Sequence, residues 1–97
     1  MAVKLLEEVR DEVTELLSEL IKINTTNPPG NETAAAKILA EYLEKEGLEC
    51  EVIESASGRG NLITRIKGEG NGPSLLLLSH LDVVPALAKE WSVPPFS

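Results

Sequence analysis

Residues 74–85 read SLLLLSHLDVVP, and this stretch decides the fold class. Its four consecutive leucines, at 75–78, are typical of a strand that is covered on both faces, as in the interior of an α/β sheet. A histidine and an aspartate, His80 and Asp82, follow directly after the run. Ligand sites of open α/β sheets gather beyond the carboxyl ends of the strands. The stretch therefore predicts a buried strand over 74–79 that delivers two polar side chains to the edge of a sheet.

Two amphipathic helices are expected ahead of this strand. Apolar residues recur at helical spacing between charged ones over about 3–23, which indicates a helix with one apolar face. Two prolines and a glycine end it in the loop 24–30. A second helix is expected over about 32–46, with Asn31 as its N-cap and Glu32 suited to the positive end of the helix dipole. Its buried stripe is expected to contain Ala35, Ile38, Leu39, Tyr42 and Leu43.

Two shorter strands are expected between the second helix and the leucine run. Gly47 suits the left-handed residue that follows a helix end. A strand over 50–54 and a strand over 62–67 are separated by a turn over 55–60, and another turn follows over 68–73. The glycines of these turns do not fit the strand-to-helix pattern of a phosphate-binding loop, and hairpin turns explain them.

The order of elements, helix, helix, strand, strand, strand, indicates an α/β fold. The leucine strand requires cover on both faces, but only two helices are available to cover the sheet. We expect either that further chain follows Ser97 or that a second copy supplies the cover. Residues 83–97 hold three prolines and are expected to be irregular. A sheet cut short would expose a bare edge at 75–78, which predicts self-association as a homo-oligomer.

Composition excludes several classes of function. The formal net charge of −7 argues against a nucleic-acid partner, which would require a basic face. The N-terminal sequence MAVKLLEEVRDE is charged throughout, so no signal peptide is visible, and the leucine run is far too short to span a membrane. The single cysteine, Cys50, cannot form an intrachain disulfide and is expected to be a small core side chain. These features predict a cytoplasmic protein without nucleic-acid or membrane partners.

The pair His80 and Asp82 is the candidate for chemistry. In extended backbone, residues i and i+2 point to the same side, so the carboxylate can reach the imidazole. A carboxylate on one ring nitrogen fixes the tautomer of a metal-bound histidine. The pair alone is weak evidence, because a histidine at a strand end is commonly only a hydrogen-bonded structural residue. Trp91 and Phe96 follow it and could wall a pocket.

The wider sequence resembles the M20 family of zinc metallopeptidases and deacylases. Residues 75–85 followed by 91–97 match an apolar strand, then His-x-Asp-Val-Val-Pro, then a Trp and a Pro-Phe. The stretch INTTNPPGNE at 23–32 resembles the loop after the family's first helix, and Gly47 fits the position ahead of its first strand. Ser79 departs from the pattern, which commonly has a glycine there. The resemblance covers nearly all 97 residues.

The resemblance implies a fold, a chemistry and site residues. It implies a partial three-layer fold in which 50–54 and 62–67 form an antiparallel hairpin and 74–79 runs parallel to the first strand, giving a three-stranded mixed sheet. It implies that His80 is a zinc ligand and that Asp82 is a catalytic residue that orients it. In complete sites of this kind, two zinc ions polarise an amide carbonyl and activate water. The implied substrates are N-acyl amino acids or small peptides.

The other metal ligands and the general base of the family's site lie outside this chain. The family's dimerisation domain lies outside it as well. Zinc sites generally need three or four protein ligands, and this chain has one histidine and one cysteine. We therefore expect residues 1–97 to be the N-terminal part of a catalytic domain that alone binds zinc weakly or not at all and is inactive. A non-catalytic binding or assembly module stays open, as does a subunit that completes its site with another chain. The loop 24–30 could line a substrate pocket, although a loop that ends a helix needs no such role.

Overall fold

The computed structural model describes residues 2–97, which divide into two compact units. The first comprises the residues up to Asn24 together with Ala86–Ser97, and the second comprises Thr25–Pro85. The second unit holds the β-sheet as well as His80 and Asp82. The residues expected to do chemistry therefore all belong to the second unit.

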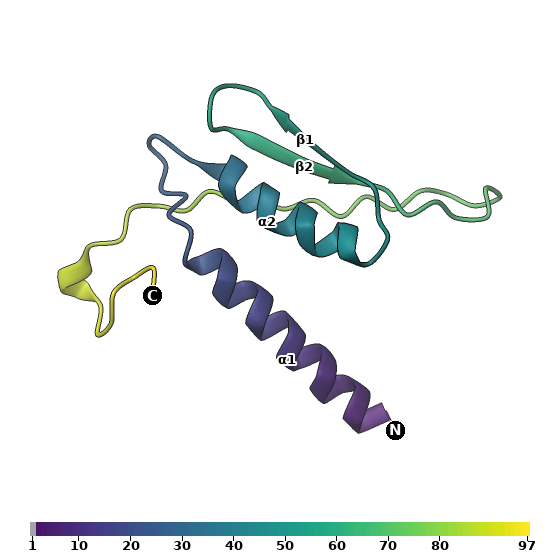
Figure 1. The fold of residues 1–97 in the computed structure, drawn as a ribbon, viewed down its shortest axis with the longest axis horizontal. Coiled ribbons are helices and arrows are strands. Elements are labelled where there is room, and N and C mark those ends of the chain that lie inside the picture. The colour runs from purple at the N-terminus through teal and green to yellow at the C-terminus, as the bar shows by residue number, and fades with distance from the viewer. Residues whose placement is uncertain (1) are drawn as a thin grey trace. The chain divides into compact units, whose positions relative to one another are not determined.

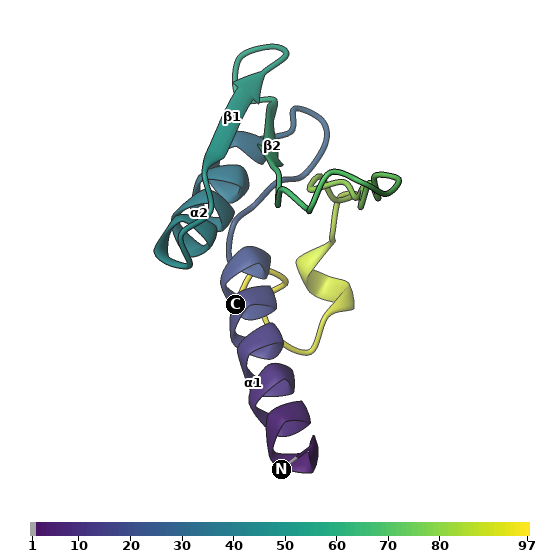
Figure 2. The same ribbon diagram turned by 90° about the vertical axis from the view of Figure 1, so that its right-hand side faces the viewer.

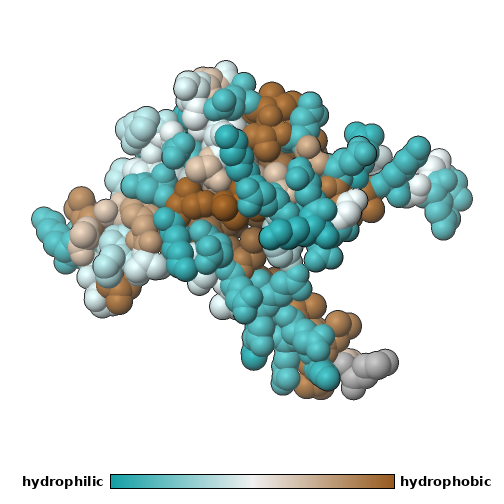
Figure 3. Space-filling view, viewed as in Figure 1, coloured by the Kyte–Doolittle hydropathy of each residue, from teal (hydrophilic) through white to brown (hydrophobic). Residues whose placement is uncertain are grey.

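The first unit contains helix α1, Ala2–Ile21, which confirms the first expected helix (Figure 1). In the C-terminal part of the unit, a single 3-10 turn, η1, spans Ala88–Glu90 within otherwise irregular chain. Apolar side chains reach the surface in both units, as the brown patches in Figure 3 show. Those of α1 that are exposed are Val3, Leu5, Leu6, Val9, Val13, Leu17 and Ile21. Across residues 2–97, neither α-helix combines the length and the apolar character that crossing a bilayer requires.

Helix α2, Glu32–Lys45, confirms the second expected helix, and it ends as the sequence predicts. Gly47 has a φ of +86°, the left-handed conformation that glycine adopts without strain. Its N–H donates to the carbonyl of Glu44 at 3.0 Å, and the N–H of Leu48 donates to the carbonyl of Leu43 at 3.1 Å. These two bonds satisfy carbonyls that a helix end leaves open.

The start of α2 differs from the expectation. Asn31 precedes the helix, but its side chain makes no capping hydrogen bond. Instead, the N–H of Thr33 donates to the carbonyl of Gly58 at 3.1 Å, in the turn after the first strand. The carboxylate of Glu54 joins the same two residues, because it accepts from Thr33 Oγ1 at 2.8 Å and from the N–H of Gly58 at 2.6 Å. The Gly58 carbonyl in the hairpin turn therefore accepts the kind of hydrogen bond that the sequence predicts for the side chain of Asn31.

Strands β1, Cys50–Glu54, and β2, Gly60–Thr64, form the antiparallel hairpin, which is therefore confirmed. The second strand begins and ends earlier than the expected 62–67. Helix α2 lies along one face of the hairpin in both ribbon views (Figures 1 and 2). The approach is close, because a Cβ built on Gly60 would lie 2.8 Å from Thr33 Cα. Only a residue without a side chain allows the helix to pack at this distance.

The core of the second unit is small and rich in alanine. Its buried hydrophobic residues are Ala35, Ala36 and Ala40, all on α2. The expected stripe is thus fully buried only at Ala35, and its larger members, Ile38, Leu39, Tyr42 and Leu43, are half-buried. Cys50, expected in the core, is also half-buried.

The leucine run does not form the buried strand that the sequence predicts. Residues 75–78 have no strand assignment, and their side chains are 80–86% exposed. In the part of the chain that the structure describes, the sheet has two strands, so the predicted third strand and its parallel pairing are not observed. A strand needs a neighbour for its N–H and C=O groups, and an apolar strand needs cover on both faces. Residues 2–97 supply neither to this run, which explains why the expectation fails.

Candidate metal-ligand pair and its hydrogen-bond network

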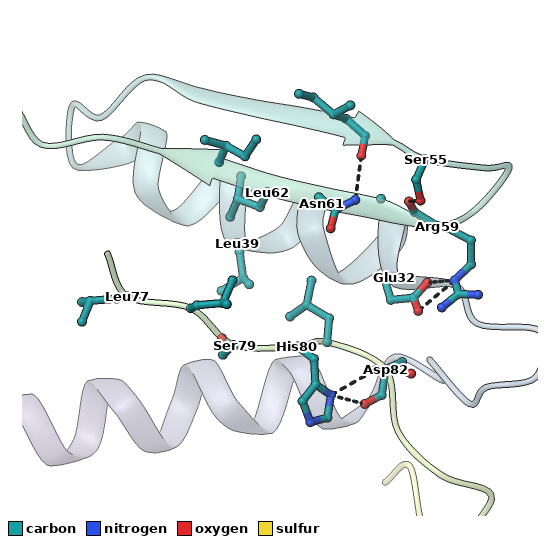
Figure 4. Close-up of a pocket in the computed structure, with 15 residues that line it drawn as sticks. Glu32, Leu39, Ser55, Arg59, Asn61, Leu62, Leu77, Ser79, His80 and Asp82 are labelled. Atoms are coloured by element: carbon teal, nitrogen blue, oxygen red, sulfur yellow. Dashed lines mark hydrogen bonds and ion pairs between the residues drawn. The ribbon is translucent and has the colours of Figure 1, made fainter. Parts of the chain in front are cut away.

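His80 and Asp82 contact each other directly (Figure 4). The imidazole Nδ1 lies 2.9 Å from the carbonyl oxygen of Asp82 and 3.0 Å from its carboxylate Oδ1. Both partners can only accept a hydrogen bond when the carboxylate is ionised, so the proton of the neutral imidazole belongs on Nδ1. The lone pair is then on Nε2, and the side chain of His80 is 85% exposed. The predicted reach of the carboxylate is confirmed, although the residues do not leave a strand.

The segment that carries the pair is anchored to an earlier loop. Thr26 and Val83 form an isolated parallel bridge. In it, the N–H of Asn27 donates to the carbonyl of Val83 at 2.9 Å, and the N–H of Val83 donates to the carbonyl of Thr25 at 3.2 Å. The buried hydroxyl of Thr25 donates to the carbonyl of Leu81 at 2.8 Å. Three hydrogen bonds therefore fix the backbone around the pair.

A side-chain contact connects the same loop to the carboxylate. Asn27 Nδ2 donates to Asp82 Oδ2 at 3.0 Å, so one carboxylate oxygen serves Asn27 and the other serves His80. The hydrogen bond from Asn27 is the main cause that lowers the pKa of Asp82, and the contact with His80 adds to it. Partial burial acts in the opposite direction but is outweighed. The carboxylate is therefore held in its ionised form, which is the form that orients an imidazole.

Glu32 and Arg59 form an ion pair beside the loop 24–30. Arg59 Nε donates to both carboxylate oxygens of Glu32, at 3.0 and 2.8 Å. Glu32 is buried, and the hydrogen bond from Arg59 lowers its pKa, while Glu32 raises the pKa of Arg59. Gly30, with a φ of +79°, fits beside this pair, since a Cβ there would lie 2.7 Å from Arg59 Nε. The ion pair thus packs directly against the loop that carries Asn27.

An open hollow of about 650 Å³ lies between the hairpin and the segment 77–82. Figure 4 shows the charged residues Glu32, Arg59 and Asp82 toward one end of it. The labelled apolar residues toward the other end are Leu39, Leu62 and Leu77. Trp91 and Phe96 belong to the other compact unit, so their expected place at the wall of a pocket stays a prediction.

Curated relatives of this chain include aminoacylases and acetylornithine deacetylases. Aminoacylase-1 from Sus scrofa is 35% identical over 84 residues, which are 84% of this chain and 20% of that protein. Aminoacylase-1 from Homo sapiens is 36% identical over 93 residues, 93% of this chain and 22% of that protein. Acetylornithine deacetylase from Vibrio parahaemolyticus is 41% identical over 86 residues, 87% of this chain and 22% of that protein. The resemblance to the M20 family is confirmed.

The chain spans about a fifth of the length of these proteins, whose names denote deacylating hydrolases. No family model matches the chain. No solved structure matches it either.

The pair has the chemistry of one part of a metal site. A neutral imidazole with Nδ1 held by a carboxylate and with an exposed Nε2 has the arrangement usual for a metal ligand. Among residues 2–97, however, no group of three His, Cys, Asp or Glu side chains could hold a metal ion. The described residues therefore supply one imidazole with the geometry of a ligand and the carboxylate that orients it.

Three residues of this network were missed by the sequence reasoning. Glu32 and Arg59 are 27 positions apart and match no local pattern, so only the folded chain brings them together. Asn27 lies within the stretch 23–32 that resembles the family's loop, and this resemblance is the one feature of the sequence that could have indicated a role for Asn27 in the site. The sequence predicts a loop that ends a helix, and in the structure this loop also holds Asp82 through Asn27.

Proposed function

We propose that residues 1–97 are the first part of the catalytic domain of a longer M20-type zinc-dependent amidohydrolase. Its substrates would be N-acyl amino acids or small peptides. The observation that carries the proposal is the 3.0 Å contact between His80 Nδ1 and Asp82 Oδ1, which leaves Nε2 as the free ligating atom. The names of the relatives support the reaction class.

Each residue of the pair has a defined role in this proposal. His80 binds zinc through Nε2, and Asp82 holds the ring in the correct tautomer and orientation. Zinc in such sites acts as a Lewis acid on the amide carbonyl and on the attacking water. The remaining ligands and the general base come from residues beyond 97. The 97-residue chain alone then binds zinc weakly and does not hydrolyse amides, because it offers too few ligands.

Calorimetric titration with zinc tests the behaviour of the chain. We expect weak binding that His80→Ala abolishes and that Cys50→Ala, which removes the only thiol, leaves unchanged. A tight zinc site in the monomer, lost in His80→Ala, would contradict the proposed incompleteness. Weak binding that His80→Ala leaves unchanged would contradict its role as a ligand.

The downstream coding sequence tests the proposed parent enzyme. We expect the reading frame to continue beyond Ser97 into further acidic and histidine ligands and a glutamate pair. The longer protein should release the acyl group from N-acetyl amino acids, and His80→Ala should abolish that release. A stop codon directly after Ser97 would refute the parent enzyme and favour a non-catalytic module or a subunit whose partner completes the site. Co-purification with a larger polypeptide would then point to the subunit.

The exposure of the leucine run supports a second part of the proposal. Residues 75–78 present four apolar side chains and an unpaired backbone segment. We propose that later chain covers this segment in the longer protein, where it becomes the third strand of a mixed sheet. In the isolated chain, the same segment pairs with a second copy, because unpaired apolar segments associate.

A further inference from the structure

We propose that Asn27 is a positioning residue for His80, and that it acts through Asp82. Asn27 holds the carboxylate so that Oδ1 faces the imidazole, which keeps the proton of the neutral ring on Nδ1. The purpose of this arrangement, a free Nε2 for zinc, rests on the function proposed above. The arrangement itself is a property of the chain without metal.

The carboxylate of Asp82 needs a second contact to keep one orientation. Rotation about the last bond of an aspartate side chain is broad and roughly twofold, so one hydrogen bond to His80 does not fix it. The side chain of Asp82 is 32% exposed, and water competes for its oxygens. Asn27 Nδ2, at 3.0 Å from Oδ2, is the side-chain donor that occupies the other oxygen. With Oδ2 engaged, Oδ1 stays in reach of Nδ1.

Asparagine suits this role chemically. An ionised carboxylate only accepts hydrogen bonds, so the amide nitrogen of Asn27 must face it. The amide is neutral, and it therefore orients Asp82 without cancelling the negative charge that attracts the proton of His80. A cation at this position would weaken that attraction, and a carboxylate would repel Asp82.

The backbone of Asn27 is held independently of its side chain. Its N–H bonds to Val83, and Thr25 bonds to Val83 and to Leu81. The ion pair of Glu32 and Arg59 packs against the same loop at Gly30. Truncation of the Asn27 side chain therefore removes one hydrogen bond and leaves the pairing of the two segments in place.

Nitrogen-15 NMR of the metal-free chain tests the proposal. His80 is the only histidine, so its ring nitrogens give one unambiguous set of signals. In a chelator-treated sample at about pH 8.5, where free imidazole is neutral, we expect Nδ1–H to be the main tautomer. In Asn27→Ala, we expect the ratio of Nδ1–H to Nε2–H to fall about fivefold, the effect of one ordinary hydrogen bond. The matched control is Asn61→Ala, because Asn61 Nδ2 donates to the carbonyl of Ile53, and it should leave the ratio unchanged.

A second variant guards against unfolding. Asn27→Asp has the same shape but replaces the donor by an acceptor, so it should also lower the ratio. The amide signals of β1 and β2 report whether each variant keeps the hairpin. If Asn27→Ala loses these signals, Asn27→Asp decides the question. An unchanged tautomer ratio in a folded Asn27 variant overturns the proposal.

Zinc titration separates this inference from the proposed function. If both hold, zinc affinity in Asn27→Ala falls about tenfold, as for other residues that orient a metal ligand. A changed tautomer ratio together with zinc binding that His80→Ala leaves unchanged supports the positioning role and refutes the ligand role. Zinc binding at His80 with an unchanged ratio in Asn27→Ala overturns the positioning role and leaves the ligand role standing.

Discussion

The β1–β2 hairpin and the leucine run at 75–78 belong to the same unit, but only the hairpin forms paired strands, and the leucine run is exposed. The leucine run is the more apolar of the two and was expected to be the more deeply buried strand. The hairpin is mixed in character, yet it pairs along five positions, from Cys50 with Thr64 to Glu54 with Gly60. A short turn connects the two strands of the hairpin, which keeps the entropic cost of bringing them together low. Apolar character thus indicates which segment prefers burial, but an available neighbour decides whether it becomes a strand.

The largest effect is expected where the hairpin meets helix α2. A Cβ on Gly60 would lie 2.6 Å from Thr33 Oγ1 and 2.8 Å from Thr33 Cα. Because the backbone cannot move away easily, Gly60→Ala should lower the free energy of unfolding by about 1–3 kcal/mol. Urea unfolding followed by circular dichroism measures it. Gly68→Ala is the control, since a Cβ there meets open space, and equal effects of the two variants would disprove the close packing.

A substitution in the leucine run should change self-association and leave the free energy of unfolding almost unchanged. Leu76→Lys places a charge on a side chain that is 80% exposed, so the free energy of unfolding should change by less than about 0.5 kcal/mol. Self-association should weaken at least about tenfold, because the charge would be desolvated against a second copy. Analytical ultracentrifugation over a range of concentrations measures it. Val84→Lys, equally exposed but outside the run, is the control, and a monomeric wild-type chain at high concentration would contradict the proposed pairing.

Acid should weaken the junction between α2 and the hairpin. Arg59 lowers the pKa of Glu32 from its ordinary value of 4.5, and Thr33 together with the N–H of Gly58 lowers that of Glu54. Below that ordinary value, the unfolded chain binds more protons than the folded chain, so stability falls as pH drops through the folded pKa values. We expect full stability above about pH 5 and a progressive loss as the pH falls below 4.5, the ordinary value of both carboxyl groups.

Glu32→Gln isolates the contribution of the ion pair. It should be less stable than the wild type at pH 7 and should lose less on acidification, as measured by urea unfolding at each pH. Glu69→Gln, at an exposed position outside the helices and strands, is the control and should follow the wild-type profile. The same acid profile in Glu32→Gln as in the wild type would exclude Glu32 as the cause.

The smallest effect is expected at Asn31. An asparagine that caps a helix through its side chain is worth about 1 kcal/mol. Because Asn31 makes no such bond and the hairpin supplies an acceptor to Thr33, Asn31→Ala should cost only about 0.3 kcal/mol. Thermal unfolding measures it against the wild type. A loss near 1 kcal/mol would restore the capping role predicted from sequence.

Sequence reasoning succeeded where structure depends on near neighbours. The end of α2 at Gly47 and the hairpin follow from residues a few positions apart, and both were predicted. The predicted strand over 74–79 is not observed, because its partners and cover are not among the described residues. Asn27 and Arg59 escaped notice because their partners lie 55 and 27 positions away, where no periodic pattern reaches. The contact of His80 with Asp82 was predicted because two residues of one segment make it.

The parallel bridge between Thr26 and Val83 has a mechanical consequence. It joins positions next to the two ends of the second unit, so tension applied to those ends passes through the bridge first. Parallel segments pulled in opposite directions are loaded in shear, and their hydrogen bonds resist together. Helix α2 and the hairpin lie in the loop that the bridge closes, so we expect them to carry load only after the bridge breaks. We therefore expect the segment that presents His80 and Asp82 to act also as the mechanical clamp of the unit.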